Sequence, residues 1–187
     1  EAGSGLQYTY HNAKNAETFG VELDVKKNLD FIGLRGLSFV CNAAYIYSRV
    51  RFEEGAPERD RPLAGQSPYL VNAGFFYQYD DKGISASLLY NRIGKRIESV
   101  GVPMQNQNED IPDIYEMPRN SLDLTFSKKI GKIVEIKAGI QDMLNSKVEY
   151  KQFVKLTDDK GGKSEREQLI RSYRPGVDIN IGVSLRF

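Results

Sequence analysis

The sequence contains few of the residues that build catalytic or disulfide-bonded sites. Of its 187 residues, one is histidine and one is cysteine. The single histidine, His11, excludes a histidine-using catalytic triad and a multi-histidine metal site within this chain; single-histidine roles stay open, and a solvated turn position is favoured over them. The single cysteine, Cys41, excludes an internal disulfide, and its apolar neighbours favour a small hydrophobic residue over a reactive thiol. We therefore expect neither an enzyme nor a bound cofactor.

Long apolar runs and a strong net charge are also missing. No run of about 18 apolar residues is present, which excludes a transmembrane helix. The net charge of +1 argues against nucleic acid as a partner. The best helical candidate, residues 165–171, is short and polar, so helical periodicity does not compete with strands. Because 40% of the residues are hydrophobic, the chain is large enough to form one unit, residues 1–187.

The chain is rich in segments that alternate apolar and polar residues with a period of two. This alternation is typical of strands whose two faces meet different environments. It is clearest in residues 177–187, where every second residue from Val177 to Phe187 is apolar and every intervening residue is polar or glycine. About eight strands are predicted in this way: residues 5–11, 19–27, 36–52, 67–79, 84–91, 122–127, 134–141 and 177–187.

The predicted connections alternate between short and long from the second strand onward. Short turns are expected at residues 28–35, 80–83 and 128–132, and long polar segments at residues 53–66, 99–115 and 155–174. Membrane β-barrels show this pattern, with short turns on the periplasmic side and long loops outside. Nothing in the architecture of a soluble sandwich or barrel requires its short loops to lie at one end and its long loops at the other.

Outward-facing aromatic residues are expected at two heights if the C-terminus is periplasmic. Two aromatic belts that flank an apolar band are typical of membrane barrels, because tyrosine hydroxyls reach the lipid headgroups. The general preference of aromatics for strands explains their number but not their heights. The predicted outer group is Tyr45, Tyr47, Tyr69 and Tyr90, and the inner group is Tyr77, Tyr79, Phe126 and Phe187.

An acidic cluster and two glycines in the predicted connections are candidate ligand sites. Glu109, Asp110 and Asp113 are of the type that binds calcium, but Ile111 and Pro112 interrupt them, so a solvated loop is favoured. The glycines, Gly94 and Gly101, make no phosphate-binding loop because no helix follows them.

Four arginines gather at the end of one predicted strand and in the loop after it: Arg49, Arg51, Arg59 and Arg61. Guanidinium groups bind anionic substrates or the phosphates of lipopolysaccharide. Pairing with nearby carboxylates is at least as good an interpretation. Those carboxylates belong to Glu53, Glu54, Glu58 and Asp60.

Several stretches of the chain, taken in order, resemble a known family. The last eight residues resemble the outer-membrane assembly signal, whose positions are filled by Asn180, Gly182, Leu185 and Phe187. Residues 61–74, 90–97, 115–119 and 138–150 resemble the C-terminal part of the β-barrel of TonB-dependent outer-membrane receptors, in particular those of Bacteroidetes-like bacteria. The resemblance covers residues 19–187, and its strength lies in the order and spacing of these stretches.

The resemblance implies an all-β, antiparallel up-and-down meander that forms part of a transmembrane β-barrel. Members of the family hold a plug domain inside a barrel of about 22 strands, so the chain would be the C-terminal barrel segment, without the plug. The implied function is energised uptake of a ligand across the bacterial outer membrane, with the C-terminus on the periplasmic side. The implied partners are outer-membrane lipid, the missing N-terminal strands and plug, TonB through that missing region, and the barrel-assembly machinery through the C-terminal strand.

Two alternatives stay open. Eight strands are enough to close a complete small outer-membrane barrel with a structural or adhesive role. Its weak points are the poor first strand, residues 5–11, and a mixed set of residues that would have to fill its interior. A soluble calycin-like binding barrel would leave the sorted loops and the C-terminal pattern as coincidences.

Overall fold

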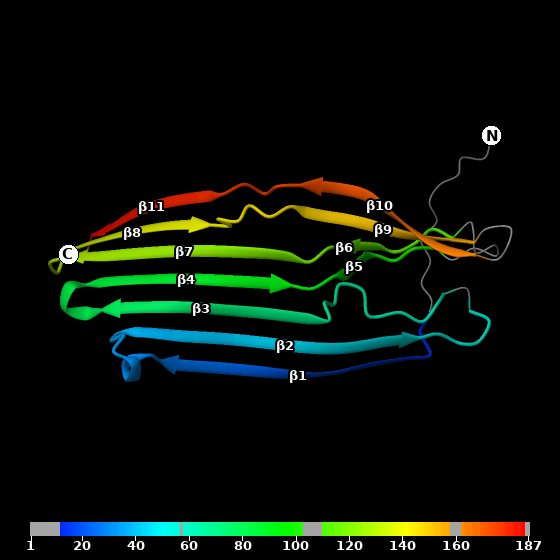
Figure 1. The fold of residues 1–187 in the computed structure, drawn as a ribbon, viewed down its shortest axis with the longest axis horizontal. Coiled ribbons are helices and arrows are strands. Elements are labelled where there is room, and N and C mark those ends of the chain that lie inside the picture. The colour runs from blue at the N-terminus through cyan, green and yellow to red at the C-terminus, as the bar shows by residue number, and fades with distance from the viewer. Residues whose placement is uncertain (1–11, 57, 103–109, 158–161, 186–187) are drawn as a thin grey trace.

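The computed structural model describes residues 12–56, 58–102, 110–157 and 162–185 (Figure 1). These residues form a seven-stranded antiparallel sheet of order β1-β2-β3-β4-β7-β8-β11 and a four-stranded antiparallel sheet of order β10-β9-β6-β5. The strands are β1 (Asn15–Asn28), β2 (Leu37–Arg51), β3 (Tyr69–Tyr79), β4 (Ile84–Ile93), β5 (Arg96–Ser99), β6 (Ile114–Glu116), β7 (Arg119–Ile130), β8 (Val134–Gln141), β9 (Val148–Thr157), β10 (Lys163–Tyr173) and β11 (Asp178–Leu185). Two short 3-10 turns, η1 (Asp30–Ile32) and η2 (Asp80–Lys82), lie in connections between neighbouring strands.

The smaller sheet continues the larger one. β5 follows β4, β7 follows β6, β9 follows β8 and β11 follows β10, each after a short interruption of the strand. The order of the smaller sheet, β10-β9-β6-β5, therefore mirrors the order β11-β8-β7-β4 of the larger sheet. Figure 1 shows the two sheets end to end, so the chain runs up and down throughout. The predicted all-β antiparallel meander is confirmed, and the described sheet is not closed into a barrel.

The interruptions contain residues that cannot continue a ladder. Pro118 lies between β6 and β7, where it lacks the N–H that a strand would donate. Gly176, between β10 and β11, has φ of 95°. Between β8 and β9, Asp142 and Asn145 have φ of 51° and 42°. These left-handed conformations turn the backbone out of the extended path and end the pairing at about one level.

The register places the apolar side of every strand of the larger sheet on one face. One row of directly opposed residues crosses six strands: Phe39, Phe75, Leu88, Leu124, Ile140 and Ile179. A shift of one residue in any pair would turn that strand's apolar side to the other face. Side chains at the two edges of this apolar face are strongly exposed, with Val21 and Ile181 both 75% accessible.

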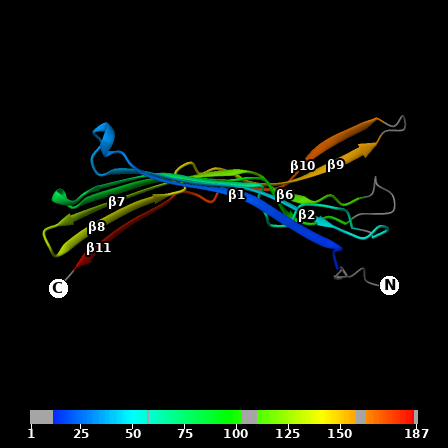
Figure 2. The same cartoon turned by 90° about the horizontal axis from the view of Figure 1, so that it is seen from below.

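The described strands form one layer, which Figure 2 shows from the side. In the part of the chain that the structure describes, elements contact their neighbours in the sheets, and no second layer covers the apolar face. The few buried hydrophobic side chains lie near the interruptions or beyond them, and they are Val50, Ile97, Val148 and Tyr150. None of the described helices has the length and apolar character needed to cross a membrane.

Seven of the predicted strands match the seven strands of the larger sheet, and the eighth, residues 5–11, lies outside the described residues. The prediction of a long polar loop at residues 155–174 is wrong, because β10 and the end of β9 form a hairpin there. β5 and β6 likewise extend into the predicted loop at residues 99–115. The weak helical candidate, residues 165–171, lies within β10. β10 has polar residues on both faces, so its pairing with β9 leaves no alternation of hydrophobicity to detect.

The predicted aromatic heights are only partly matched by the strand register. Tyr45 lies directly opposite Tyr69, as expected for one group. Tyr90, expected in the same group, lies opposite Ala73 instead. Its hydroxyl nevertheless donates a 2.7 Å hydrogen bond to Asn120, towards the interruption between β6 and β7. Residues that lie directly opposite each other in the register form a row perpendicular to the strands. In barrels the strands are tilted, so the residues of one such row lie at different depths in the membrane.

Candidate binding surface beyond the strand interruptions

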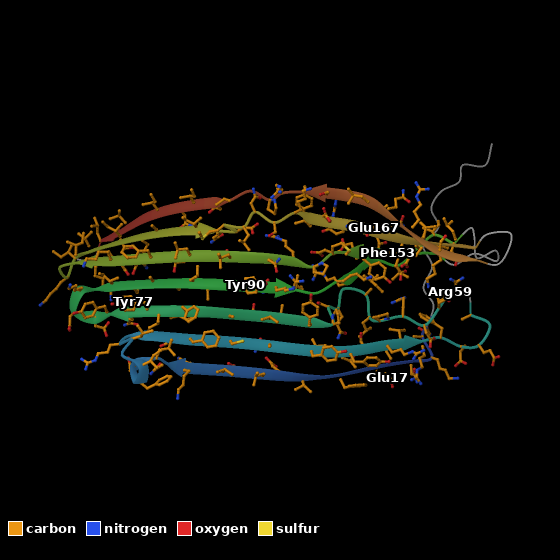
Figure 3. The ribbon with its side chains drawn as sticks, viewed as in Figure 1. Glu17, Arg59, Tyr77, Tyr90, Phe153 and Glu167 are labelled. Carbon is orange, nitrogen blue, oxygen red and sulfur yellow. The ribbon has the colours of Figure 1, made fainter. Side chains whose placement is uncertain are left out.

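A cavity of about 430 Å³ lies at the end of the molecule that carries the long connections. It is lined by the β2–β3 connection at residues 58–62, by the residues around β5 and β6, and by residues of β9 and β10. Figure 3 shows Arg59 and Phe153, two of its lining residues, towards this end, and Tyr77 towards the end with the short turns. The cavity thus combines segments that are far apart in the sequence.

An aromatic pair forms one wall of the cavity. The rings of Tyr115 in β6 and Phe153 in β9 meet edge to face, with centroids 5.8 Å apart. The ammonium group of Lys95 lies 4.3 Å from the centroid of Tyr115 and 4.4 Å from that of Phe153. Burial raises the pKa of the Tyr115 hydroxyl above its ordinary value, and the carboxylate of Asp113 raises that pKa further. The wall therefore presents a cation over two rings, and one of these rings is a phenol that resists ionisation.

The acidic cluster is engaged with protein groups rather than solvated. Asp110 pairs with Arg59 at 2.5 Å, and its side chain is 16% exposed. Asp113 accepts hydrogen bonds from the backbone N–H of Gly101 at 2.8 Å and from the hydroxyl of Tyr115 at 3.3 Å. Glu109 lies outside the described residues. Within the described ranges, no group of three or more histidine, cysteine, aspartate or glutamate residues is arranged to hold a metal ion. The favoured solvated loop is thus corrected to a paired cluster.

The two glycines near the cavity are required by close packing. A Cβ atom added to Gly94 would lie 2.8 Å from a ring carbon of Tyr69. A Cβ atom added to Gly101 would overlap the carbonyl oxygen of Ile111. The backbone of Val102, the residue after Gly101, pairs with that of Ile111 across the connection. These contacts assign both glycines a steric role.

The four arginines that the sequence analysis singled out make separate contacts. Arg49 pairs with Asp60 at 3.1 Å, as the pairing alternative predicted. Arg51 pairs instead with Glu17 of β1 at 2.9 Å. Arg59 forms an ion pair with Asp110, and the guanidinium of Arg61 lies 5.6 Å from the ring centroid of Phe52. A single cluster that is open to one anion is therefore not formed.

Sequence reasoning missed a buried ion pair at the strand interruptions. Arg119, the first residue of β7, donates a 2.6 Å hydrogen bond to the carboxylate of Asp142, whose side chain is 12% exposed. The backbone N–H of Asp142 donates to Asp123 at 2.8 Å. The sequence gives little sign of this ion pair, because Asp142 in residues 138–150 looks like an aspartate of an ordinary loop. This network joins β7 to the interruption that follows β8.

The face opposite the apolar side carries cross-strand hydrogen bonds between polar side chains. Asn42 donates to Glu22 at 2.7 Å, and Asn91 donates to Asn72 at 2.5 Å. Further along, the hydroxyl groups of two directly opposed pairs are hydrogen-bonded, at 2.6 Å between Ser87 and Thr125 and at 2.7 Å between Ser85 and Ser127. Such pairs are compatible with a wet surface.

The predicted assembly-signal residues lie on the edge strand. Asn180, Gly182 and Leu185 are on β11, opposite Gly139, Lys137 and Val134 of β8. A Cβ atom added to Gly139 would lie 2.8 Å from Oδ1 of Asn180, whereas one added to Gly182 would meet nothing within 4 Å. The fourth residue, Phe187, lies outside the described residues. These three do not converge on a pocket, and their role as a signal stays a prediction.

Together these features define a class of protein: an antiparallel one-layer sheet with one exposed apolar face, one polar face and a cavity at one end. Comparison with known proteins then finds a similarity to transferrin-binding protein A of Haemophilus influenzae. The two are 25% identical over 152 residues, which is 74% of this chain and 16% of that protein. The chain therefore spans about one sixth of the length of this relative. No protein-family model matches the sequence, and no solved structure matches the fold.

Proposed function

We propose that the chain is the C-terminal barrel portion of a TonB-dependent receptor of the bacterial outer membrane, which takes up a ligand with energy supplied through TonB. The role of this portion is binding rather than catalysis. It supplies part of the lipid-facing wall, part of the lining of the lumen, and connections that contact the ligand outside. The distant similarity to a protein that is named for binding transferrin supports an outer-membrane, ligand-binding role.

One observation carries this proposal: the exposed apolar face of the larger sheet. The apolar sides of β1, β2, β3, β4, β7, β8 and β11 lie in register on this face, and Phe19, Tyr45 and Val183 on it are each more than 60% exposed, at 64%, 63% and 63%. A contiguous apolar surface of this extent in water is unfavourable and marks an interaction surface. Lipid accommodates it, because the strands satisfy their backbone groups within the sheet.

The distribution of connections supports an orientation. The connection that contains η1, the one that contains η2 and the β7–β8 turn lie at one end of the larger sheet, and the β2–β3 connection and the smaller sheet lie at the other (Figure 1). Short turns face the periplasm in outer-membrane barrels. The C-terminal strand β11 runs towards that same end, which supports a periplasmic C-terminus.

The two edges of the larger sheet support a fragment of a larger barrel over a complete small one. β1 and β11 are the outermost described strands, and they do not pair with each other. Unpaired edges are not tolerated within the hydrocarbon region, so both need further strands. We infer that the missing N-terminal strands supply them, with a plug domain inside the barrel and with β11 recognised by the assembly machinery.

Cysteine labelling in intact cells tests the proposal. In the full-length protein with its cysteines removed, including Cys41→Ala, one cysteine is placed in the long β2–β3 connection (Glu54→Cys) and another in the short β7–β8 turn (Lys132→Cys). A membrane-impermeant maleimide is expected to label Glu54→Cys in intact cells and Lys132→Cys only after the outer membrane is permeabilised. Equal labelling of both positions in intact cells, or the reverse order, would contradict the proposed membrane position.

A further inference from the structure

Arg92 is a charged residue on the apolar face of β4, close to the interruption after that strand. Leu88 and Tyr90 precede it on the same face. In the register, Arg92 lies opposite Val71 of β3 and Asn120 of β7. It is thus a cation beside the region that the proposed function places in lipid, at the end of the larger sheet next to the long connections.

Neutral groups hold the guanidinium of Arg92 in place. Its Nε donates a 3.2 Å hydrogen bond to the hydroxyl of Tyr69, and Nη1 donates a 2.7 Å hydrogen bond to Oδ1 of Asn120. The same Oδ1 accepts a 2.7 Å hydrogen bond from the hydroxyl of Tyr90. The guanidinium carbon lies 6.0 Å from the ring centroid of Tyr69. Two neighbouring strands therefore fix the orientation of the group.

The charge of Arg92 is not balanced by a carboxylate within the described part of the chain. The arginines near it differ in this respect: Arg96 pairs with Glu116 at 2.7 Å, and Arg119 pairs with Asp142 at 2.6 Å. A guanidinium has five N–H donors, and the bonds to Tyr69 and Asn120 use two of them. Because the oxygen of Tyr69 accepts from Arg92, the Tyr69 O–H remains able to donate.

We propose that Arg92 and Tyr69 bind the phosphate of a lipid headgroup in the outer leaflet. A phosphate offers a negative charge and several acceptor oxygens, which suit a guanidinium beside a hydroxyl donor. Lipid is favoured over free phosphate as the source, because Val71 and Tyr90 continue the apolar face beside the site and provide a surface for acyl chains. The inference rests on the proposed function, since lipid reaches Arg92 only when this face lies in a membrane.

Lipid binding to the full-length protein in detergent micelles tests this site by native mass spectrometry. The probes are lipid A with two phosphates, the same lipid with both phosphates removed, and inorganic phosphate as a competitor. The variants are Arg92→Gln, which removes the charge, and Tyr69→Phe, which keeps the ring and removes the hydroxyl. Arg51→Gln is the matched control, because Arg51 lies at the same end of the sheet but is paired with Glu17.

The phosphorylated lipid is expected to bind about tenfold more weakly to Arg92→Gln and about threefold more weakly to Tyr69→Phe, with no change in Arg51→Gln. Removing the phosphates from the lipid should abolish the difference between wild type and Arg92→Gln. Unchanged binding in both Arg92→Gln and Tyr69→Phe would overturn the site. Displacement of the lipid by inorganic phosphate at equal concentration would overturn its assignment to lipid. Either result leaves the labelling of Glu54→Cys and Lys132→Cys unaffected, so failure of the site is distinguishable from failure of the proposed function.

Discussion

A guanidinium nitrogen of Arg119 lies 2.6 Å from a carboxylate oxygen of Asp142, and this ion pair connects β7 to the interruption after β8. The same interruption is held from the other side by Asn145, which accepts hydrogen bonds at its backbone and side-chain oxygens from Arg174 at 2.6 Å and from the N–H of Gly176 at 3.1 Å. These contacts join the interruption after β8 to the interruption before β11.

Removing the charge of Asp142 is expected to destabilise the folded protein. Asp142→Asn leaves Arg119 half-buried without a carboxylate and should cost about 1–3 kcal/mol. Asp142→Ala should cost about 1–2 kcal/mol more, because Asp142 has φ of 51° and alanine is strained in that region. The midpoint of thermal unfolding in detergent measures both. Arg51→Gln is the control, because its pair with Glu17 is largely exposed and should contribute about 0.2–1 kcal/mol.

Alanine substitutions at two glycines in the β1–β2 connection compare the energetic cost of backbone strain with that of steric overlap. Gly33 and Gly36 have φ of 85° and 75°. A Cβ atom would meet nothing within 4 Å at Gly33, but at Gly36 it would overlap the carbonyl oxygen of Gln78. Gly33→Ala should therefore cost about 1–2 kcal/mol, and Gly36→Ala clearly more. Equal losses of unfolding free energy in the two variants would show that the approach of Gly36 to β3 is not maintained.

The stability of the smaller sheet is expected to fall at alkaline pH through Tyr115. Burial and the nearby Asp113 raise the folded-state pKa of Tyr115 above 10.0, so the unfolded chain loses this proton first as the pH rises. The contribution of Tyr115 to stability is thus complete below pH 10 and is lost as the pH rises towards the folded-state pKa. Absorbance titration of phenolate should show a late-titrating component that loses one tyrosine in Tyr115→Phe and keeps Tyr150, whose pKa burial also raises. Asp113→Asn should lower that pKa, and an unchanged late titration in both variants would contradict the assignment.

Substitution of Gly182 distinguishes a packing role of β11 from a role in the outer-membrane assembly signal. A Cβ atom there meets nothing within 4 Å, so Gly182→Ala should leave the unfolding free energy unchanged within about 0.5 kcal/mol or slightly raised. If Gly182 belongs to the assembly signal, the same variant should lower the amount of folded protein in outer-membrane fractions, and Phe187→Ala should lower it further. A fall in stability that parallels the fall in amount would instead point to a packing role.

The ammonium group of Lys95 should couple energetically to the ring of Phe153. Lys95→Gln and Phe153→Leu, alone and combined, form a double-mutant cycle on unfolding free energy. We expect a coupling of about 0.5–1 kcal/mol, because Lys95 is exposed and water screens the interaction. A coupling near zero would mean that the ammonium group does not lie on the ring.

Most of the larger sheet follows from the sequence, because strand faces depend on local alternation. The period of two predicts that Leu88 and Leu124 lie on the apolar faces of their strands, and their direct opposition in the register agrees with this prediction. The turn at η2 follows from a glycine, Gly83, whose φ is 57°. The β9–β10 hairpin was missed because polar residues on both faces of β10 leave no such pattern.

The sequence by itself determined the two faces of the sheet and the sorting of its connections, since both are set by residues close together in the chain. Only the tertiary structure decided which distant residues meet: Arg59 with Asp110, Lys95 with Phe153, and Arg92 with Tyr69 and Asn120. Those contacts depend on which strands pair, on their register, and on where each strand is interrupted. A local pattern does not contain that information, because it specifies which way a side chain faces and not what lies opposite it.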